Sequence, residues 1–268
     1  MGRFRIGVLG AGNMGSALVR GIVREGVAKP TEVVVSDVDP SKLAPLGDEI
    51  GVRTTTDNGE AASAATVILA VKPQVLREVA TEIGPHLKEG ALVISIAAGV
   101  RLKTLEALLP ERVAVVRVMP NIAVKVGRGI SAYSLGSRAV GKHAEEVERI
   151  FGAIGDVFEV PEGYMDAITA LSGSGIAFFF LLAEAMVDAG VRVGLPREVA
   201  WRVVKWVLGG AGEMALRHKG HPAELRELVT SPGGTTIAGQ HALESGGFRG
   251  LVMDAIEAAT QRARELSQ

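Results

Sequence analysis

The sequence has no cysteine among its 268 residues, which excludes disulfides, thiol nucleophiles and thiolate metal sites. It also has almost no net charge, with 29 Lys and Arg against 30 Asp and Glu, and no basic run interleaved with aromatic residues. We therefore expect no nucleic-acid partner. The longest uncharged run, 167–183, is interrupted by 172-SGSG-175, and the N-terminal stretch MGRFRIGVLGAG lacks a secretory signal pattern. A cytoplasmic protein with no membrane span is the expectation.

Metal ligands and catalytic histidines are also scarce. None of the histidines stands in an i, i+4 pattern with Glu, and none forms a convincing pair with a carboxylate. We predict no metal site, and we expect surface or helix-end roles for His86, His143, His218, His221 and His241.

The first 160 residues alternate short apolar runs with helical patterns. The runs are apolar nearly throughout, as strands buried on both faces are. This alternation predicts an α/β fold with a doubly wound parallel sheet covered by helices on both faces. The predicted strands are 4-FRIGVL-9, 32-EVVVS-36, 66-TVILAV-71, 91-ALVISIA-97 and 112-RVAVVRV-118.

Strand patterns stop after 156-DVFEVPEG-163, and long helices rich in Ala, Leu and Val follow. We place a domain boundary near residue 160, with a dinucleotide-binding domain at 1–160 and a helical domain at 161–268. The helical part has more apolar faces than about a hundred residues can cover alone. Homo-oligomerisation through this part is the favoured explanation, and a compact helical domain is the alternative.

A glycine motif, 10-GAGNMG-15, follows the first predicted strand and opens a helical run. Gly10 permits a tight turn, Gly12 lets a pyrophosphate approach the backbone, and Gly15 allows the helix to pack against the strand. This is the Rossmann-type arrangement, in which the positive helix end meets the phosphates. The alternative is a glycine-rich turn without a ligand. Predicted cofactor-binding residues here are Leu9, Gly10, Ala11, Gly12, Asn13, Met14 and Gly15.

Asp37 ends the second predicted strand, where an acidic side chain accepts hydrogen bonds from the adenosine ribose hydroxyls. A carboxylate at this place favours NADH over NADPH, because a 2′-phosphate would meet it at close range. In one alternative, Asp37 turns away and Ser36 and Asn58 donate to a phosphate. In another, Asp37 is a surface or turn residue.

Two further strand ends, 70-AVKP-73 and 96-IAAG-99, carry small residues or a Lys-Pro pair at the edge where open parallel sheets bind ligands. Small residues leave room for ribose and nicotinamide, and Lys72 can face the cofactor or a substrate carboxylate. The alternative is that Pro73 starts a helix and Gly99 ends a strand. Predicted cofactor-binding residues here are Ala70, Val71, Lys72, Pro73, Ala97, Ala98 and Gly99.

The chain resembles the pyrroline-5-carboxylate reductase family over nearly its whole length. The resemblance is carried by 10-GAGNMG-15, 70-AVKP-73, 93-VISIAAGV-100, 119-MPN-121, 171-LSGSG-175, 221-HPAELRELVTSPGGTTI-237 and 243-LESGGFR-249. It implies reduction of a cyclic imine to L-proline by NADPH or NADH, in the last step of proline biosynthesis. It also implies a helical domain that joins two subunits, commonly in a ring of dimers, with the substrate between the cofactor and the helical domain.

The same resemblance implies roles for the stretch 230-TSPGGTTIAGQ-240. Backbone N–H groups of the loop hold the substrate carboxylate, and the hydroxyl of Thr236 contacts the ring nitrogen as the catalytic group. Without the resemblance, a cluster of helix N-cap residues explains this stretch equally well. The implied substrate-binding residues are Ser231, Gly233, Gly234, Thr235 and Thr236.

Two stretches depart from the family pattern. The chain has 119-MPNIAV-124 where the family continues Met-Pro-Asn with Thr-Pro, and 174-SGIAF-178 where the family has Ser-Gly-Pro-Ala-Tyr. Ile122, Ala123, Ile176 and Phe178 therefore replace a hydroxyl, two prolines and a phenol. These replacements bear on substrate identity rather than on the reaction type.

Two other functions compete with this interpretation. A related imine or 2-oxo/3-hydroxy acid reductase is disfavoured because 167-AITALSGSGIAFFFLLAEAM-186 lacks the lysine that the hydroxy-acid enzymes carry on their interdomain helix. A non-catalytic NAD(P)-sensing protein would not need the hydroxyl loop, yet SPGGTT is intact.

Overall fold

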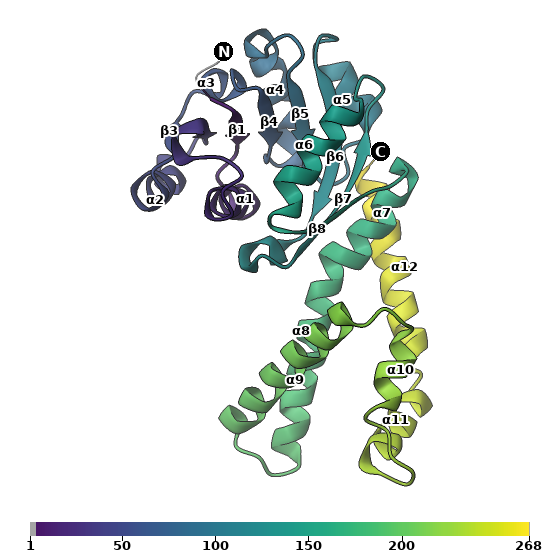
Figure 1. Cartoon of the computed structure of the whole chain (residues 1–268). Helices are drawn as coiled ribbons and strands as arrows, with labels where there is room; N and C mark the ends of the chain where they lie inside the picture. Colours follow the sequence, from purple (N-terminus) through teal and green to yellow (C-terminus); the bar gives the residue numbers. More distant parts are fainter. Residues whose placement is uncertain (1–3, 268) are drawn as a thin grey trace. The chain divides into compact units, whose positions relative to one another are not determined.

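The computed structural model describes residues 4–267, and within them eight strands form one sheet in the order β3-β2-β1-β4-β5-β6-β7-β8 (Figure 1). Neighbouring strands are parallel except β6 and β7, which pair antiparallel. The predicted doubly wound sheet is confirmed, and it is mostly rather than wholly parallel. The strands are β1 (Ile6–Leu9), β2 (Val33–Ser36), β3 (Arg53–Thr55), β4 (Thr66–Leu69), β5 (Leu92–Ser95), β6 (Ala114–Pro120), β7 (Gly129–Leu135) and β8 (Gly155–Glu159).

Helices cover both faces of this sheet because successive strand residues point to opposite sides. Val33 and Val35 of β2 join a core with α1, α2 and α6, whereas Val34 joins a core with α3, α4 and α5. These helices are α1 (Asn13–Arg24), α2 (Pro40–Ile50), α3 (Asn58–Ala62), α4 (Pro73–Ile83), α5 (Leu102–Leu108) and α6 (Gly141–Gly152). Short 3-10 turns are η1 (Pro30–Glu32), η2 (Gly84–His86), η3 (Ile122–Val126) and η4 (Glu162–Tyr164).

β8 falls in the last strand pattern of the sequence, 156-DVFEVPEG-163, but two strands, β3 and β7, were not among those predicted. β3 is a short edge strand with a partly exposed surface, so it has no continuous apolar run. β7 is well buried but carries hydroxyl residues, whose partners the sequence alone does not reveal. The Tyr133 hydroxyl donates to Glu148 Oε1 at 2.7 Å, and the Ser134 hydroxyl donates to the Val160 carbonyl at 2.6 Å. These bonds make a polar strand compatible with burial.

The chain forms two compact units, one of residues 1–173 with 259–268 and one of residues 174–258. The first unit extends past the predicted boundary near 160 because a buried arginine draws later segments onto the sheet. Arg117 of β6 is 3% exposed, and its guanidinium lies 3.1 Å from Glu162 Oε1 and 3.6 Å from Asp166 Oδ1. Asp166 in turn accepts from the Ser267 hydroxyl at 3.0 Å, which fixes the last turn of the chain.

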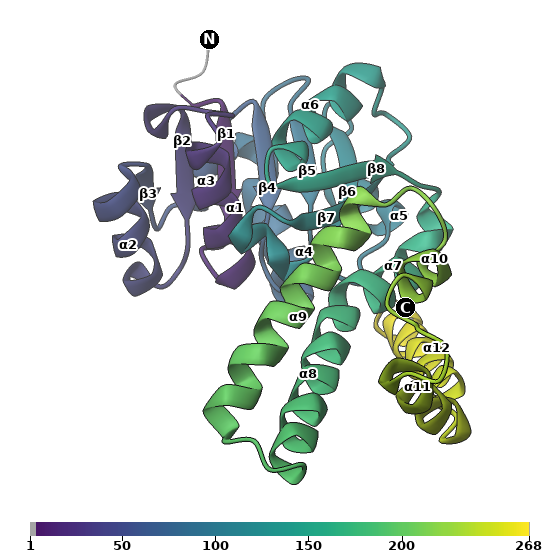
Figure 2. The same cartoon turned by 60° about the horizontal axis from the view of Figure 1, so that its bottom comes forward.

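The second unit is wholly helical, as the sequence predicts. α8 and α9 lie side by side and pack through Ala183, Val187, Ala200 and Val204 (Figure 2). Large apolar side chains remain exposed on both helices, including Phe179, Phe180 and Trp206. The stretch Glu162–Arg192 is long and apolar enough, by composition alone, to cross a membrane, and 22% of its most apolar window is buried.

The helices after the sheet are α7 (Met165–Ile168), α8 (Gly175–Arg192), α9 (Arg197–Arg217), α10 (Pro222–Glu227), α11 (Thr235–Ser245) and α12 (Phe248–Leu266). A π-helical segment, η5 (Thr169–Ser174), stands between α7 and α8.

Candidate functional site

The glycine loop between β1 and α1 has the geometry that its motif predicts. Gly10 has φ +103°, and a side chain there would meet the Ala70 carbonyl oxygen at 2.6 Å. A side chain at Gly15 would collide with the Gly10 carbonyl, so the helix packs against the turn without room for a Cβ. The space beside Gly12 is open, with no atom within 4 Å of an added Cβ. This opening lies at the start of α1, where Gly12 is the N-cap residue and makes no side-chain cap bond.

Asp37, at the end of β2, is turned toward this loop. Its Oδ2 accepts from the Ala11 backbone N–H at 2.7 Å, and its Oδ1 accepts from the Asp39 N–H at 2.9 Å and lies 3.4 Å from Lys42 Nζ. The side chain is only 9% exposed. Asp37 therefore holds the glycine loop in place, a function that the sequence pattern did not reveal, and it keeps acceptor capacity for a ribose hydroxyl.

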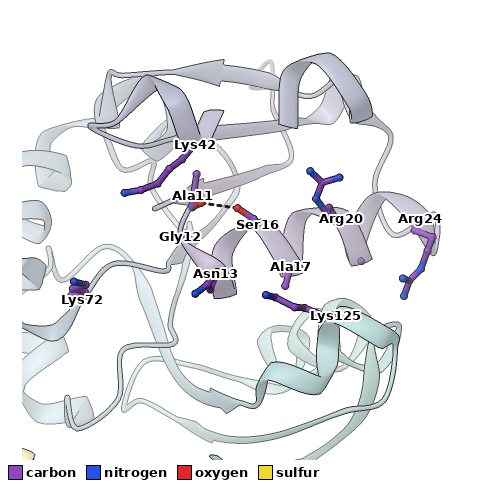
Figure 3. Close-up of a pocket in the computed structure, with 11 residues that line it drawn as sticks. Ala11, Gly12, Asn13, Ser16, Ala17, Arg20, Arg24, Lys42, Lys72 and Lys125 are labelled. Carbon is purple, nitrogen blue, oxygen red and sulfur yellow. Dashed lines mark hydrogen bonds between the residues drawn. The ribbon is translucent and has the colours of Figure 1, made fainter. Parts of the chain in front are cut away.

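A basic pocket lies along the loop and the first turns of α1 (Figure 3). The pocket has a volume of about 710 Å³ and no acidic residue in its lining. Ser16 closes the loop beneath it by donating its hydroxyl to the Ala11 carbonyl at 2.6 Å. The lining residues are Ala11, Gly12, Asn13, Ser16, Ala17, Arg20, Gly21, Arg24, Lys42, Lys72 and Lys125. Five cationic side chains beside an open helix N-terminus fit a diphosphate group.

A second pocket of about 340 Å³ adjoins the first and shares Gly12, Lys42 and Lys72 with it. Val38, Val75 and Val79 supply apolar walls, which suit an adenine ring. Asp37, Glu78 and Glu82 supply carboxylates. The charged pocket residues that were not among the predicted cofactor-binding residues are Arg20, Arg24, Lys42, Lys125, Glu78 and Glu82. The signal for the last two was the i, i+3/i+4 spacing of Val75, Glu78, Val79 and Glu82 along the helix that follows 70-AVKP-73.

The predicted cofactor-binding residues separate into those in the pockets and those that build the loops. Gly10, Gly12, Asp37, Asn58, Ala70, Val71 and Lys72 line the second pocket, and Ala11 and Asn13 line the first. Leu9 and Ser36 are buried in the sheet, and Met14 packs against its core. Gly15 lies in the first turn of α1, Pro73 begins α4, and Ala97, Ala98 and Gly99 lie in the loop after β5; none of these residues lines either pocket.

Three parallel strands bring these loops to one edge of the sheet. β4 and β5 follow β1 in the sheet order, and the Ala70 and Ile96 backbone N–H groups donate to the preceding strands' Leu9 and Leu69 carbonyls at 2.8 and 3.1 Å. Gly99 has φ +78°, and a side chain there would meet the Leu266 carbonyl oxygen at 2.8 Å. The last turn of the chain therefore packs on the 96-IAAG-99 loop, which explains why glycine stands there.

In the helical unit, residues 231–236 form a turn that leads into α11. Gly233 has φ +67°, and the Gly234 N–H donates to the Ser231 carbonyl at 3.1 Å. A proline followed by a positive-φ glycine is the sequence of a type II turn. Gly234 is the N-cap of α11 and no side chain caps this end, so the N-cap explanation of the stretch is not realised. Thr236 is half-buried, whereas Thr235 is exposed.

Two of the histidines accept hydrogen bonds from backbone N–H groups at the starts of helices, in line with the expected helix-end roles. The Nδ1 atom of His143 accepts from the Val140 N–H at 3.0 Å at the start of α6, and burial, followed by the charge of Lys142, lowers its pKa. His221 similarly accepts from the Ala223 N–H at 3.2 Å at the start of α10. Within residues 4–267, His, Asp and Glu form no group of three or more that could hold a metal ion.

The doubly wound sheet, its glycine loop and the basic pocket define a dinucleotide-binding oxidoreductase of the Rossmann class. Comparison with known proteins places it more narrowly, and the chain belongs to the pyrroline-5-carboxylate reductase family. The family model described as pyrroline-5-carboxylate reductase dimerisation matches residues 162–266. A model described as NADP oxidoreductase, coenzyme F420-dependent, matches residues 5–99.

The full-length relatives agree with this assignment. The pyrroline-5-carboxylate reductase of Methanosarcina acetivorans is 43% identical over 98% of this chain and 98% of its own, and that of Pisum sativum is 40% identical over 98% and 96%. The solved structure of the Coxiella burnetii enzyme has a TM-score of 0.93 and 37% identity, covering 99% of each chain. The Plasmodium falciparum enzyme with NADP bound has a TM-score of 0.88 and 31% identity over all of both chains.

Proposed function

We propose that this protein reduces the cyclic imine 1-pyrroline-5-carboxylate to L-proline with NAD(P)H, in the last step of proline biosynthesis. The observation that carries the proposal is the open amide turn 231–236 in a chain at least 40% identical to named reductases over 98% of its length. The basic pocket in the sheet unit supports the use of a dinucleotide, and we assign cofactor binding to residues 1–160 and substrate binding to residues 161–268.

The cofactor, when bound, supplies the hydride. The protein's own residues have simpler tasks. Ala11, Gly12 and Asn13 open the start of α1 toward the diphosphate, and Lys72 and Lys125 add positive charge to the same pocket. Asp37 keeps the loop in this conformation through its bond with Ala11. A loop held before the cofactor arrives loses less conformational freedom on binding, so affinity rises.

The turn 231–236 is assigned to the substrate. Its glycines leave the N–H groups at the start of α11 uncovered, and such groups, at the positive end of a helix, bind a carboxylate. The hydroxyl of half-buried Thr236 is assigned to the ring nitrogen because a threonine hydroxyl both donates and accepts. Ser231, Gly233, Gly234 and Thr235 complete the loop.

No strong general acid is required in this reaction. A cyclic imine is readily protonated, so the hydride acceptor arrives as a cation, and the site has to align it and exclude water. This agrees with histidines such as His143 and His221, whose ring nitrogens are engaged in capping helices rather than in a catalytic pair.

We also propose that two copies of the chain associate through the helical part, with such dimers joined in a ring, in the cytoplasm. The match of residues 162–266 to a dimerisation family supports self-association, as do the exposed Phe179, Phe180 and Trp206. Burial of these side chains in a homodimer removes apolar surface from water, and it accounts for an apolar helix without a membrane. Light scattering of the purified protein tests this, and a monomer at micromolar concentration contradicts it.

The reaction is tested by following the nicotinamide absorbance of NADPH and NADH with the purified protein. We expect oxidation of the cofactor with 1-pyrroline-5-carboxylate and formation of L-proline, with little or no reaction with a 2-oxo acid. Faster turnover of the 2-oxo acid would support the hydroxy-acid reductase alternative. Binding of the nucleotide without turnover of any of these substrates would support a sensor.

A further inference from the structure

The two adjoining pockets of the cofactor site differ in charge. The larger has five cationic residues and no acidic one in its lining. The smaller is lined by Asp37, Glu78 and Glu82 against Lys42 and Lys72, so its carboxylates outnumber its cations. Gly12 belongs to both linings, which places the phosphate-binding loop between them. The smaller, partly apolar pocket is therefore the adenosine end of the cofactor site, and the residues that line it carry a net negative charge.

A chain of hydrogen bonds crosses the adenosine end. The Ser36 hydroxyl donates to Asn58 Oδ1 at 2.8 Å, and Asn58 Nδ2 donates to Glu82 Oε2 at 2.9 Å. Ser36 and Asn58 are the two polar side chains that could otherwise bind a 2′-phosphate next to Asp37. The bond with Glu82 therefore orients the Asn58 amide toward α4. The bond with Asn58 in turn orients the Ser36 hydroxyl proton toward the Asn58 side chain.

These contacts favour the binding of NADH over the binding of NADPH. The 2′-hydroxyl of NADH needs an acceptor, and Asp37 and Glu82 are acceptors. The 2′-phosphate of NADPH needs donors and positive charge, but one of the two Asn58 amide donors is engaged by Glu82, whose carboxylate also repels the phosphate. Lys42, 3.4 Å from Asp37 Oδ1 and 3.8 Å from Asp39 Oδ2, is itself neutralised by two carboxylates.

We infer that Glu82 is a specificity-determining residue that holds Asn58 away from the 2′-phosphate position and so makes NADH the preferred reductant. The inference rests on the proposed use of NAD(P)H by this site. It concerns the nucleotide end alone, so it can be tested with ligands that lack nicotinamide.

The test compares adenosine 2′,5′-bisphosphate with 5′-AMP, using calorimetric binding to the full-length protein. Glu82→Ala removes both the charge and the acceptor for Asn58, and Glu82→Gln removes the charge but keeps an acceptor. Glu78→Ala is the matched control, since Glu78 is a carboxylate of the same helix and pocket and, within residues 4–267, makes no hydrogen bond with Asn58.

In Glu82→Ala we expect the affinity for the bisphosphate, relative to 5′-AMP, to rise about fivefold or more, as loss of an exposed charge and release of one donor together allow. Glu82→Gln should give a smaller rise, and Glu78→Ala a change under about twofold. In an Asn58→Ala background the Glu82→Ala gain should shrink, because the released donor is absent. The ratio of kcat/KM for NADPH to kcat/KM for NADH should rise most in Glu82→Ala, less in Glu82→Gln and least in Glu78→Ala.

Equal shifts in Glu82→Ala and Glu78→Ala would overturn the inference, since any carboxylate in the pocket would then act alike. So would an unchanged ratio in Glu82→Ala, or a wild-type enzyme that prefers NADPH. Failure of the proposed reaction is distinguishable, because the binding ratio does not depend on turnover. A protein that binds both nucleotides with the predicted ratios but does not reduce the imine would contradict the reaction alone.

Discussion

The Ala11 backbone N–H donates to Oδ2 of Asp37 at 2.7 Å, and this bond ties the end of β2 to the glycine loop after β1. A residue that the sequence assigns to the ribose is therefore also a support for the phosphate-binding loop. The two roles make different demands on the side chain: the support needs an acceptor oxygen, whereas rejection of a 2′-phosphate needs a negative charge. Substitutions at position 37 can separate them.

Asp37→Asn keeps an acceptor for Ala11 but loses the charge. The ratio of kcat/KM for NADPH to kcat/KM for NADH should therefore rise by about tenfold. Asp37→Ser loses the support as well, and it should weaken the binding of both cofactors by about tenfold or more, because the N–H of buried Ala11 is left unpaired. Steady-state kinetics and NADH titrations of both variants check this. If Asp37→Ser binds NADH as tightly as the wild type, the loop does not depend on Asp37.

Thr236→Ala should lower kcat by about ten- to a thousandfold with little change in cofactor affinity, because it removes one hydrogen bond to the reacting centre. Thr236→Ser, which keeps the hydroxyl, should recover much of the activity. The comparison variant is Thr235→Ala, at the exposed neighbouring position of the same substrate loop, which should raise KM for the imine more than it lowers kcat. Wild-type turnover in Thr236→Ala together with loss of turnover in Ser231→Ala would move the nitrogen contact from Thr236 to Ser231.

Ile122 and Ile176 depart from the family pattern, and we predict that they shape substrate selectivity. Ile122 is 38% exposed and Ile176 is partly exposed, so both are free to contact a ligand, and Ile176 lies directly after the π-helical segment η5 in a continuous helical run. Ile122→Thr with Ile176→Pro should change the kcat/KM ratio between five- and six-membered cyclic imino acids more than about fivefold. A shifted melting temperature with an unchanged ratio would mean that these residues serve packing instead.

His143 should make the protein less stable in acid. Its folded-state pKa is lowered from 6.5 by burial, so the unfolded chain takes up the proton first as pH falls. The contribution of the neutral ring is therefore present above pH 6.5 and declines below it, and protonation of Nδ1 also breaks the bond to the Val140 N–H.

His143→Gln keeps an acceptor at the third position of α6, as in a capping box, but does not titrate. It should match the wild type at neutral pH and lose less stability in acid. His143→Ala should cost about 1 kcal/mol at neutral pH. Denaturant unfolding at both pH values measures this, and equal acid sensitivity of the wild type and His143→Gln would show that other groups control it.

Much of the fold was predictable because its signals are local. The strands Val33–Ser36 and Thr66–Leu69 are apolar nearly throughout, so consecutive residues already predict that both faces of each strand are buried. β7 was not predictable in this way, since its buried hydroxyls need Glu148 and the Val160 carbonyl, which come from later segments of the chain. The compact units likewise depart from the boundary near 160 because Arg117 binds Glu162 and Asp166.

The sequence by itself determined the family, the glycine loop and the turn 231–236, because glycine spacing and turn residues act over a few positions. Only the tertiary structure decided that Asp37 supports Ala11 and that Glu82 reaches Asn58. Hydrogen bonds and ion pairs form across a few ångströms of space, and Asn58 and Glu82 stand on different helices, α3 and α4. No spacing along the chain encodes such a contact; the packing of the two helices on one face of the sheet creates it.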